Sequence, residues 1–277
     1  MTPNELIHCD IAKMNFSFSM VSSLMNKQLK KYECEKEGNI VITSKIVDKL
    51  EVPNGEIEYH SKYYDIYRDG ESLIQVQRDE SENIFGIVIY NPNSAVILLE
   101  NENVARKEYL LSEYAVLYYI LRDQDAILIH SSSILYKDRG ILFIAKSGTG
   151  KSTQARLWKA HLDIVQVNDD KNIIIKENDE LWIYGNPWSG KSFIDTNIRV
   201  KLTDLVFIYQ SPENKIREIS KKEQFLYLIP QITNSSFMYN RDKWDMMTNA
   251  LMDMNGYSMG CTLSYDAVDM LKNRLEA

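Results

Sequence analysis

In the first hundred residues, hydrophobic and polar side chains alternate with a period of two over several short stretches. Residues 15–20 and 63–67 show this alternation, and the second stretch ends in an Asp-Gly dipeptide at 69–70 that is typical of hairpin turns. Apolar runs at 87–90 and 95–99 are separated by a proline-containing turn. This pattern is typical of half-buried strands, so we predict a β-rich region built on an antiparallel sheet.

The second part of the chain has a different pattern, in which short apolar runs alternate with helix-like segments. Residues 108–122 carry apolar side chains on one broad face of a helix, and we expect this helix to bridge the two parts. Apolar runs at 126–129, 140–145 and 164–167 predict strands, and residues 151–162 have the spacing of an amphipathic helix. This alternation is typical of an α/β unit.

Further elements follow toward the C-terminus. The runs 171–175 and 181–184 are joined by polar residues and predict a hairpin, so we expect the sheet to be mixed. The remaining predicted elements are a strand at 206–209 and helices at 221–229, 242–254 and 264–275.

Together these patterns predict an α/β (α+β) fold in two domains. Residues 1–105 form a β-rich accessory or substrate-binding domain, and residues 106–277 form a domain with a mixed sheet and a phosphate-binding loop. The length of 277 residues and the hydrophobic fraction of 44% fit one large domain or two smaller ones with a substantial core.

Charge and hydropathy exclude several classes of partner. The net charge of −7 and the absence of a basic stripe argue against nucleic acid, whose binding needs dense Lys and Arg. The longest strongly apolar stretch, 115–121, is too short to span a bilayer, and the N-terminus has no signal-peptide pattern. We therefore expect a cytoplasmic protein without a membrane partner, whose three scattered cysteines are reduced and structural. The sequence leaves the oligomeric state open, a homo-oligomer included.

Residues 145–152 read A-K-S-G-T-G-K-S, one substitution away from the G-x-x-x-x-G-K-[ST] phosphate-binding loop. An apolar strand precedes them and an amphipathic helix follows, which is the context that the motif requires. Glycines let successive backbone N–H groups turn toward phosphate oxygens, and the start of the helix favours an anion. The nucleotide-binding residues that the motif predicts are Ser147, Gly148, Thr149, Gly150, Lys151, Ser152 and Thr153.

The motif also assigns individual roles. Lys151 is expected to reach the β- and γ-phosphates of ATP, and Ser152 is expected to place its hydroxyl on Mg²⁺. A second Gly-Lys-Ser at 190–192 follows Pro187 and Trp188 and has no strand before it or clear helix after it. Lys191 could swing a cation toward phosphate from this loop, or the segment could be a rigid surface turn.

Two adjacent acids follow the strand predicted at 164–167. Asp169 is expected to bind Mg²⁺, and Asp170 is expected to orient an acceptor hydroxyl and accept its proton. Neighbouring residues of an extended chain point in opposite directions, so the two carboxylates can serve two roles. The alternative is a solvated Asn-Asp-Asp-Lys turn. His130, at the end of the strand predicted from 126, is either a structural residue or a further group near the transferred phosphoryl.

These residues together resemble the HPr kinase/phosphorylase family, which shares its nucleotide-binding core with ATP-dependent phosphoenolpyruvate carboxykinases. The resemblance covers about residues 126–186 and rests on the inner Ser-Gly of the loop, on His130 and on the Asp169-Asp170 pair. By this likeness Asp170 accepts the proton of a serine hydroxyl and Asp169 is the acid on the metal side. The segments Gly-Lys-Ser-Thr-Gln-Ala-Arg-Leu-Trp, Asn-Asp-Asp and Asn-Pro-Trp-Ser-Gly-Lys look most like the small peptide- or protein-kinase subgroup.

The chain departs from the family pattern in two segments. It has no counterpart of the family's metal-binding Glu-x-Arg-Gly segment, and only Asn240-Arg241 echoes its basic C-terminal Pro-Gly-Arg-Asn loop. Recognition of HPr itself and a reverse phosphorolytic reaction are therefore not carried over.

The leading hypothesis is an ATP- and Mg²⁺-dependent kinase that phosphorylates a serine or threonine hydroxyl of a peptide or small protein. Asp170, Lys151 and His130 are its predicted catalytic residues, and Lys191 is a further predicted nucleotide contact. Two alternatives are a small-molecule kinase or carboxykinase, and a nucleotide-binding regulatory module that has lost catalysis.

Overall fold

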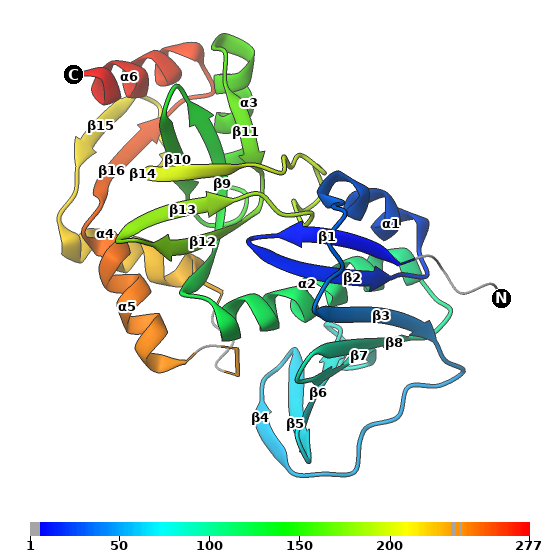
Figure 1. The fold of residues 1–277 in the computed structure, drawn as a ribbon. Helices are drawn as coiled ribbons and strands as arrows, with labels where there is room; N and C mark the ends of the chain where they lie inside the picture. Colours follow the sequence, from blue (N-terminus) through cyan, green and yellow to red (C-terminus); the bar gives the residue numbers. More distant parts are fainter. Residues whose placement is uncertain (1–5, 234–236, 239) are drawn as a thin grey trace. The chain divides into compact units, whose positions relative to one another are not determined.

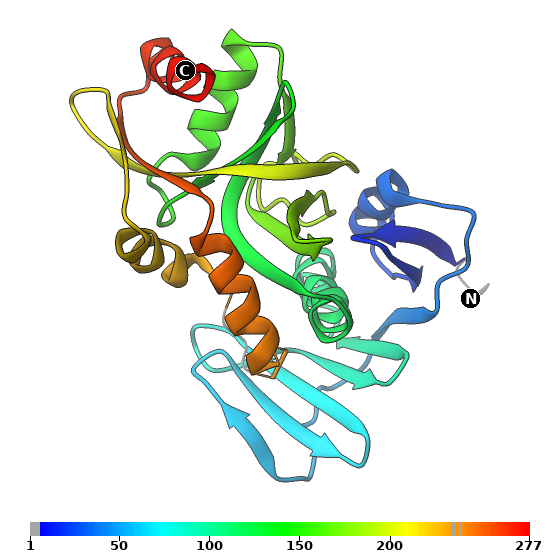
Figure 2. The same cartoon turned by 60° about the vertical axis from the view of Figure 1, so that its left-hand side comes forward.

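The computed structural model describes residues 6–233, 237–238 and 240–277 (Figures 1 and 2). Contacts between α-carbons divide the chain into two compact units, Met1–Asp123 and Gln124–Ala277. The division falls after helix α2 (Val104–Asp123), whereas the boundary predicted from the sequence lies at 105/106. Helix α2 packs on strands of the first unit and belongs to it, because its broad apolar face is buried on that sheet.

The first unit is built on one eight-stranded sheet with the order β1-β2-β3-β8-β7-β6-β5-β4. Its strands are β1 (Ile7–Ile11), β2 (Met14–Ser19), β3 (Ile40–Ile46), β4 (Ile57–His60), β5 (Tyr64–Asp69), β6 (Ser72–Arg78), β7 (Ile84–Asn91) and β8 (Ser94–Leu99). The expected antiparallel sheet is wrong for one part, because β3 pairs in parallel with both β2 and β8. The link from β2 to β3 contains helix α1 (Ser23–Leu29) and the short helix η1 (Lys30–Tyr32), and such a crossover allows parallel pairing.

The tyrosines near residue 60 mainly pack within this sheet. Tyr64 and Tyr67 are buried, and the ring of Tyr59 stacks on that of Tyr64 with centroids 5.4 Å apart. A small apolar cluster around Val76 and Ile87 includes Tyr67.

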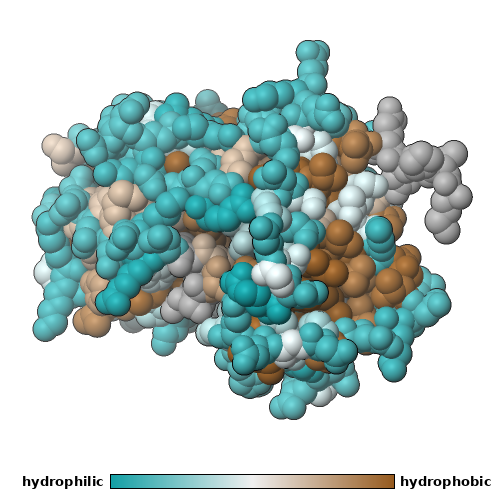
Figure 3. Space-filling model, turned by 60° about the horizontal axis from the view of Figure 1, so that its bottom comes forward, coloured by the Kyte–Doolittle hydropathy of each residue, from teal (hydrophilic) through white to brown (hydrophobic). Residues whose placement is uncertain are grey.

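The face of the molecule in Figure 3 is mostly hydrophilic, with a hydrophobic area on one side.

The second unit has one mixed sheet with the order β10-β9-β12-β13-β14-β16-β15, and β11 also pairs with β9. Its strands are β9 (Ala126–Tyr136), β10 (Arg139–Ile144), β11 (Val165–Asn168), β12 (Lys171–Glu177), β13 (Glu180–Tyr184), β14 (Arg199–Gln210), β15 (Lys215–Glu218) and β16 (Asn255–Cys261). Strand β10 pairs in parallel with β14 as well as antiparallel with β9, which closes a ring of strands. The predicted mixed sheet and the α+β class are confirmed.

Helices cover this sheet with two apolar clusters. Helices α3 (Lys151–His161) and α6 (Tyr265–Glu276) lie side by side in Figures 1 and 2, and Trp158 and Leu271 are fully buried in the cluster beneath them. Helices α4 (Lys221–Leu228), η2 (Ile229–Gln231) and α5 (Arg241–Met252) pack on the other cluster. The first cluster anchors the helix that begins at Lys151 and so holds the start of that helix in place. Across the described part of the chain, no helix combines the length and the apolar character needed to cross a membrane.

Candidate active site

The glycine-rich segment 145–152 connects the end of β10 to the start of α3, as the sequence predicts. Gly148 and Gly150 have φ angles of +78° and +117°, where any residue with a side chain is strained. Gly150 is the N-cap of α3, and as a glycine it makes no side-chain capping bond to the first N–H groups of that helix. Those N–H groups, with the positive end of an 11-residue helix behind them, can therefore donate to an anion.

Lys151 is the first residue of α3, and its side chain folds back over this loop. Its Nζ donates to the carbonyl oxygens of Ala145 at 2.8 Å and Lys146 at 3.3 Å, and it lies 2.9 Å from Nε2 of His130. Burial lowers the pKa of the Lys151 ammonium, and nearby carboxylate charges oppose this shift. The lysine is thus a partly desolvated cation that is held beside the backbone carbonyls of the loop.

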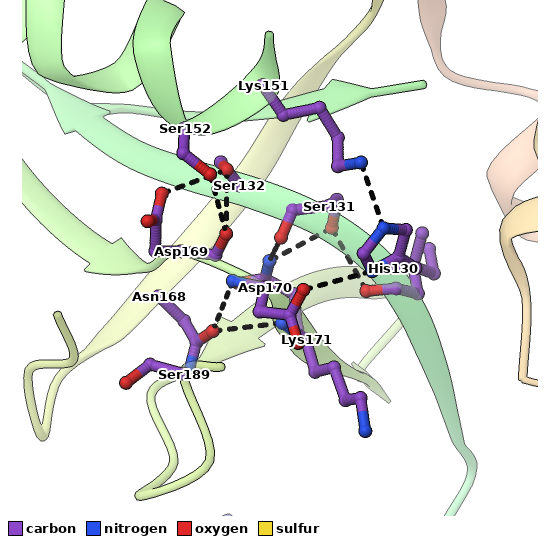
Figure 4. A network of polar contacts seen from close by, with 12 residues as sticks. His130, Ser131, Ser132, Lys151, Ser152, Asn168, Asp169, Asp170, Lys171 and Ser189 are labelled. Carbon is purple, nitrogen blue, oxygen red and sulfur yellow. Dashed lines mark hydrogen bonds and ion pairs between the residues drawn. The ribbon is translucent and has the colours of Figure 1, made fainter. Parts of the chain in front are cut away.

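His130 connects this lysine to Asp170 (Figure 4). Its Nδ1 lies 3.2 Å from Oδ1 of Asp170, while its Nε2 faces the lysine. An ammonium group has only donors, so Nε2 accepts and the ring proton sits on Nδ1, where it donates to the carboxylate. A cation, an imidazole and a carboxylate therefore lie in series, and each of the two hydrogen bonds has one donor and one acceptor.

Asp170 is partly exposed, with 31% of its side chain accessible, and His130 beside it is exposed to a similar extent at 30%. Burial alone would raise the pKa of its carboxyl group, but the His130 hydrogen bond acts in the opposite direction. The positive charges of Lys171 and Lys151 add to this opposing effect, and the pKa of Asp170 lies below its ordinary value. Asp170 is consequently a carboxylate at neutral pH and can accept a hydrogen bond from an incoming group.

The two aspartates occupy the link between strands that share one neighbour. Strand β11 pairs with β9 at 133–135, and β12 pairs with β9 at 126–130, so the link faces the serines at 131–132. Ser132 Oγ lies 2.9 Å from the carbonyl oxygen of Asp169 and 3.1 Å from its Oδ1, and Gln166 Nε2 donates to the same Oδ1 at 2.9 Å. These bonds fix Asp169 while leaving Asp170 to face the hollow beside His130.

His130 does not end its strand, which corrects the prediction. Strand β9 continues to Tyr136 through three fully buried serines. These serines are buried although they are polar, because their hydroxyls form hydrogen bonds. Ser132 Oγ bonds to Asp169, and Ser133 Oγ bonds to Asn168 and Asn172. The strand is therefore polar where it carries the site.

Asn168 ties the aspartates to the loop that contains the second Gly-Lys-Ser. This fully buried side chain accepts from the backbone N–H groups of Asp170 and Lys171, each at 3.0 Å. Its Nδ2 donates to the carbonyl oxygens of Asn186 at 3.1 Å and Trp188 at 3.4 Å. A single amide thus links the turn of the acids to the segment that follows β13.

Ser152 and Asp169 are the residues that could hold a metal. Ser152 Oγ lies 3.5 Å from the carbonyl oxygen of Asp169, and both residues line the same hollow. In residues 6–233, 237–238 and 240–277, no group of three or more His, Cys, Asp or Glu side chains is placed to hold an ion. The donors present are hard oxygens and few, which fits Mg²⁺ bound jointly by protein and phosphate rather than a closed protein site.

Most of the predicted residues line one hollow of about 280 Å³, which we call the polar hollow. Its lining residues are His130, Ser147, Gly148, Gly150, Lys151, Ser152, Thr153, Arg156, Asp169 and Asp170. Thr149 is not among them and lines a neighbouring hollow instead. Lys191 is exposed and does not line the polar hollow, so its contact with nucleotide stays a prediction. Its neighbour Gly190 is the residue of that loop that lies against Asp170.

Four residues had no role predicted from the sequence: Arg156, which lines the polar hollow, and Ser132, Gln166 and Asn168, which bond to the two aspartates. Arg156 lies one helical turn after Ser152, a spacing that places both on one face of α3. Gln166 and Asn168 alternate with Val165 and Val167, so a half-polar strand leading into two acids was the available signal.

Comparisons with known proteins leave the function to be argued from this geometry. No family model matches the chain, and no curated protein matches it. Among solved structures, the HPr(Ser) kinase/phosphatase from Coxiella burnetii is similar with a TM-score of 0.31 and 13% sequence identity, covering 54% of this chain and 99% of that chain. Similarity at this level carries no argument for the fold or the activity.

Proposed function

We propose that this protein is an ATP- and Mg²⁺-dependent kinase that transfers the γ-phosphoryl group to a serine or threonine hydroxyl of a peptide or small protein. The observation that carries the proposal is the series Lys151–His130–Asp170, with contacts of 2.9 and 3.2 Å, at the uncapped start of α3. In this proposal Lys151 is the phosphate-binding cation and Asp170 is the proton-accepting carboxylate, one on each side of the His130 ring.

Phosphate binding is assigned to the glycine loop and Lys151. The backbone of Gly148 and Gly150 supplies the turns that direct N–H groups inward, and the start of α3 adds its dipole. Lys151 can exchange a loop carbonyl for a phosphate oxygen, because its Nζ already lies within 3.3 Å of three acceptors, one on His130 and two on the backbone of the loop. The gain is large because the ammonium is partly desolvated.

Mg²⁺ is assigned to Ser152 and Asp169, whose oxygens suit a hard cation shared with phosphates. When bound, the ion neutralises charge on the phosphoryl oxygens. Ser132 and Gln166 both bond to Oδ1 of Asp169 and hold the carboxylate in one orientation. These two residues therefore position a ligand rather than contact the nucleotide.

The acceptor hydroxyl is assigned to Asp170. In the transfer, the bond from the γ-phosphorus to the bridging oxygen breaks, a bond to the acceptor oxygen forms, and the acceptor proton passes to the Asp170 carboxylate as the diphosphate leaves. His130 keeps Asp170 ionised and oriented through its Nδ1 proton. Recruitment of the peptide or protein acceptor is assigned to the β-rich first unit.

Two lysines of helix α3 provide a matched test. At about 100 times its dissociation constant, Mg-ATP should stabilise the protein by about 2.7 kcal/mol, which raises the melting temperature by roughly 5–10 °C. Lys151→Ala should abolish this shift, whereas Lys159→Ala should keep it, because Lys159 is exposed on the same helix and does not line the polar hollow. The same three proteins are then incubated with γ-labelled ATP and candidate peptides.

Three outcomes decide between the alternatives. A shift with labelled peptide supports the kinase, and a shift without transfer to any hydroxyl compound favours a regulatory module that binds nucleotide. A shift that is equal in the wild type and Lys151→Ala would remove the loop from nucleotide binding and the proposal with it.

A further inference from the structure

The glycine loop separates two hollows of opposite chemistry. Ser147, Gly148 and Gly150 face the polar hollow, whereas Ala145, Lys146 and Thr149 line a second hollow of about 450 Å³. We call this second one the aromatic hollow. Its size falls in the range of about 300–1,000 Å³ that is typical of small-molecule sites.

The aromatic hollow is lined mainly by flat or apolar side chains, most of them from β14 and α4. Phe207 and Tyr209 come from the end of β14, and Leu226 and Tyr227 come from α4. The rings of Phe207 and Tyr227 lie 5.7 Å apart at an angle of 48°. Tyr209, Leu226 and Tyr227 are between 41% and 58% exposed although they are large and hydrophobic, so the structure leaves a partly uncovered aromatic wall.

Two of the polar residues that line this hollow are buried, Gln231 of η2 and Ser258 of β16, which are 9% and 8% exposed. The other polar lining residues are Lys146 and Thr149 of the glycine loop and Arg217, which forms an ion pair with Glu223. A side-chain amide both donates and accepts hydrogen bonds, and a hydroxyl does the same. An aromatic wall with two such groups has the composition needed to hold a flat heterocycle and to bond to its edge.

We propose that the aromatic hollow binds the purine base of the nucleotide whose phosphates occupy the polar hollow. This inference rests on the proposed function, because the loop that would bind the phosphates is the wall shared by the two hollows. A nucleoside triphosphate has the matching division into a flat apolar part and an anionic part. The acceptor then enters the polar hollow from the Asp170 side, away from the base.

The test compares ATP with inorganic tripolyphosphate, which has the phosphates but no base. Titration calorimetry in the presence of Mg²⁺ should show that the wild type binds ATP at least about tenfold more tightly than tripolyphosphate, given the strength of aromatic stacking on bases. Tyr227→Ala should weaken ATP binding about tenfold and leave tripolyphosphate binding unchanged. Unchanged tripolyphosphate binding also shows that the variant is folded.

Phe225→Ala is the matched control, because Phe225 is 48% exposed on the same helix but does not line the hollow. It should leave both affinities unchanged. Equal affinities of the wild type for ATP and tripolyphosphate, or an equal loss of both ligands in Tyr227→Ala, would overturn the base site while the phosphate site stands. If neither ligand binds the wild type, the proposed function itself fails.

Discussion

Gly190 lies directly against the carboxyl group of Asp170. A β-carbon added to Gly190 would lie 3.0 Å from Cβ, Cγ and Oδ2 of Asp170, and the φ angle of Gly190 is +66°. The second Gly-Lys-Ser therefore contacts the candidate site through its glycine. Gly190 leaves room for the carboxyl group of Asp170, to which the proposed function assigns the acceptor proton.

We predict that Gly190→Ala lowers turnover at least about tenfold, because the methyl group displaces Asp170 by a few tenths of an ångström and small misplacements reduce transfer strongly. Gly70→Ala is the control. Gly70 has a φ of +59° but open space around it, so both variants carry a left-handed strain of about 1–2 kcal/mol. Steady-state kinetics and thermal melts are compared, and an equal loss of turnover in the two variants would show that contact with Asp170 is irrelevant.

Asp170→Asn should bind Mg-ATP with nearly unchanged affinity and lose phosphoryl transfer by a factor of about 10²–10⁴, since an amide cannot accept the proton. Calorimetry measures the first property and label transfer the second. Asp138→Asn, at an exposed turn of the same unit, should change neither. Full activity of Asp170→Asn would show that another group takes the proton.

Asn168→Ala should destabilise the protein by about 2–4 kcal/mol, because two backbone N–H donors and two carbonyl oxygens lose their partner at a buried position. The melting temperature should fall by roughly 5–10 °C. Asn249→Ala, at an exposed position of α5, should not lower it. A change below about 1 kcal/mol in Asn168→Ala would mean that the acids keep their turn without this amide.

Glu223 should make part of the stability depend on pH. Hydrogen bonds from Arg217 and from the backbone of Ser220 lower the pKa of Glu223 to about 2 from an ordinary 4.5. Because the folded-state pKa is the lower one, the stabilisation is present above pH 4.5 and is lost as the pH falls toward 2.

Glu223→Gln keeps the capping geometry of α4 and removes the charge, so its melting temperature should fall less steeply than that of the wild type between pH 4.5 and 2. Glu213→Gln, at an exposed turn, serves as the control and should follow the wild type. Parallel curves for Glu223→Gln and the wild type would contradict the prediction. The effect should be small because the pair is exposed and screened by solvent.

The local parts of the candidate site could be predicted from sequence because their signals are short. A strand, a glycine-containing turn and a helix are adjacent in the chain, and so are Asp169 and Asp170. His130 could be named but not placed, because buried serines hide the continuation of β9 from a hydrophobic pattern. The nearness of Gly190 to Asp170 depends on the path of a loop, and no local pattern indicates it.

The parts of the fold that were missed depend on contacts between distant segments. Strand β16 contains two glycines and a serine, and it is a strand because β14 and β15 pair with it on both sides. The parallel pairing of β3 with β8 joins segments separated by four other strands. Hydrophobic alternation reports burial of one face, but it does not report the direction of the neighbouring strand.

The common pairing of β11 and β12 with β9 has a consequence for where the chain can change in length. Both strands take their register from β9, so a residue added or deleted between Gln166 and Lys171 would have to be accommodated in the bend at 169–170 and would move both carboxylates. The hairpin turn at 178–179 and the turn at 211–214 lie outside these pairings. A peptide tag or fluorescent reporter is therefore best inserted at those two turns, where the acids keep their positions.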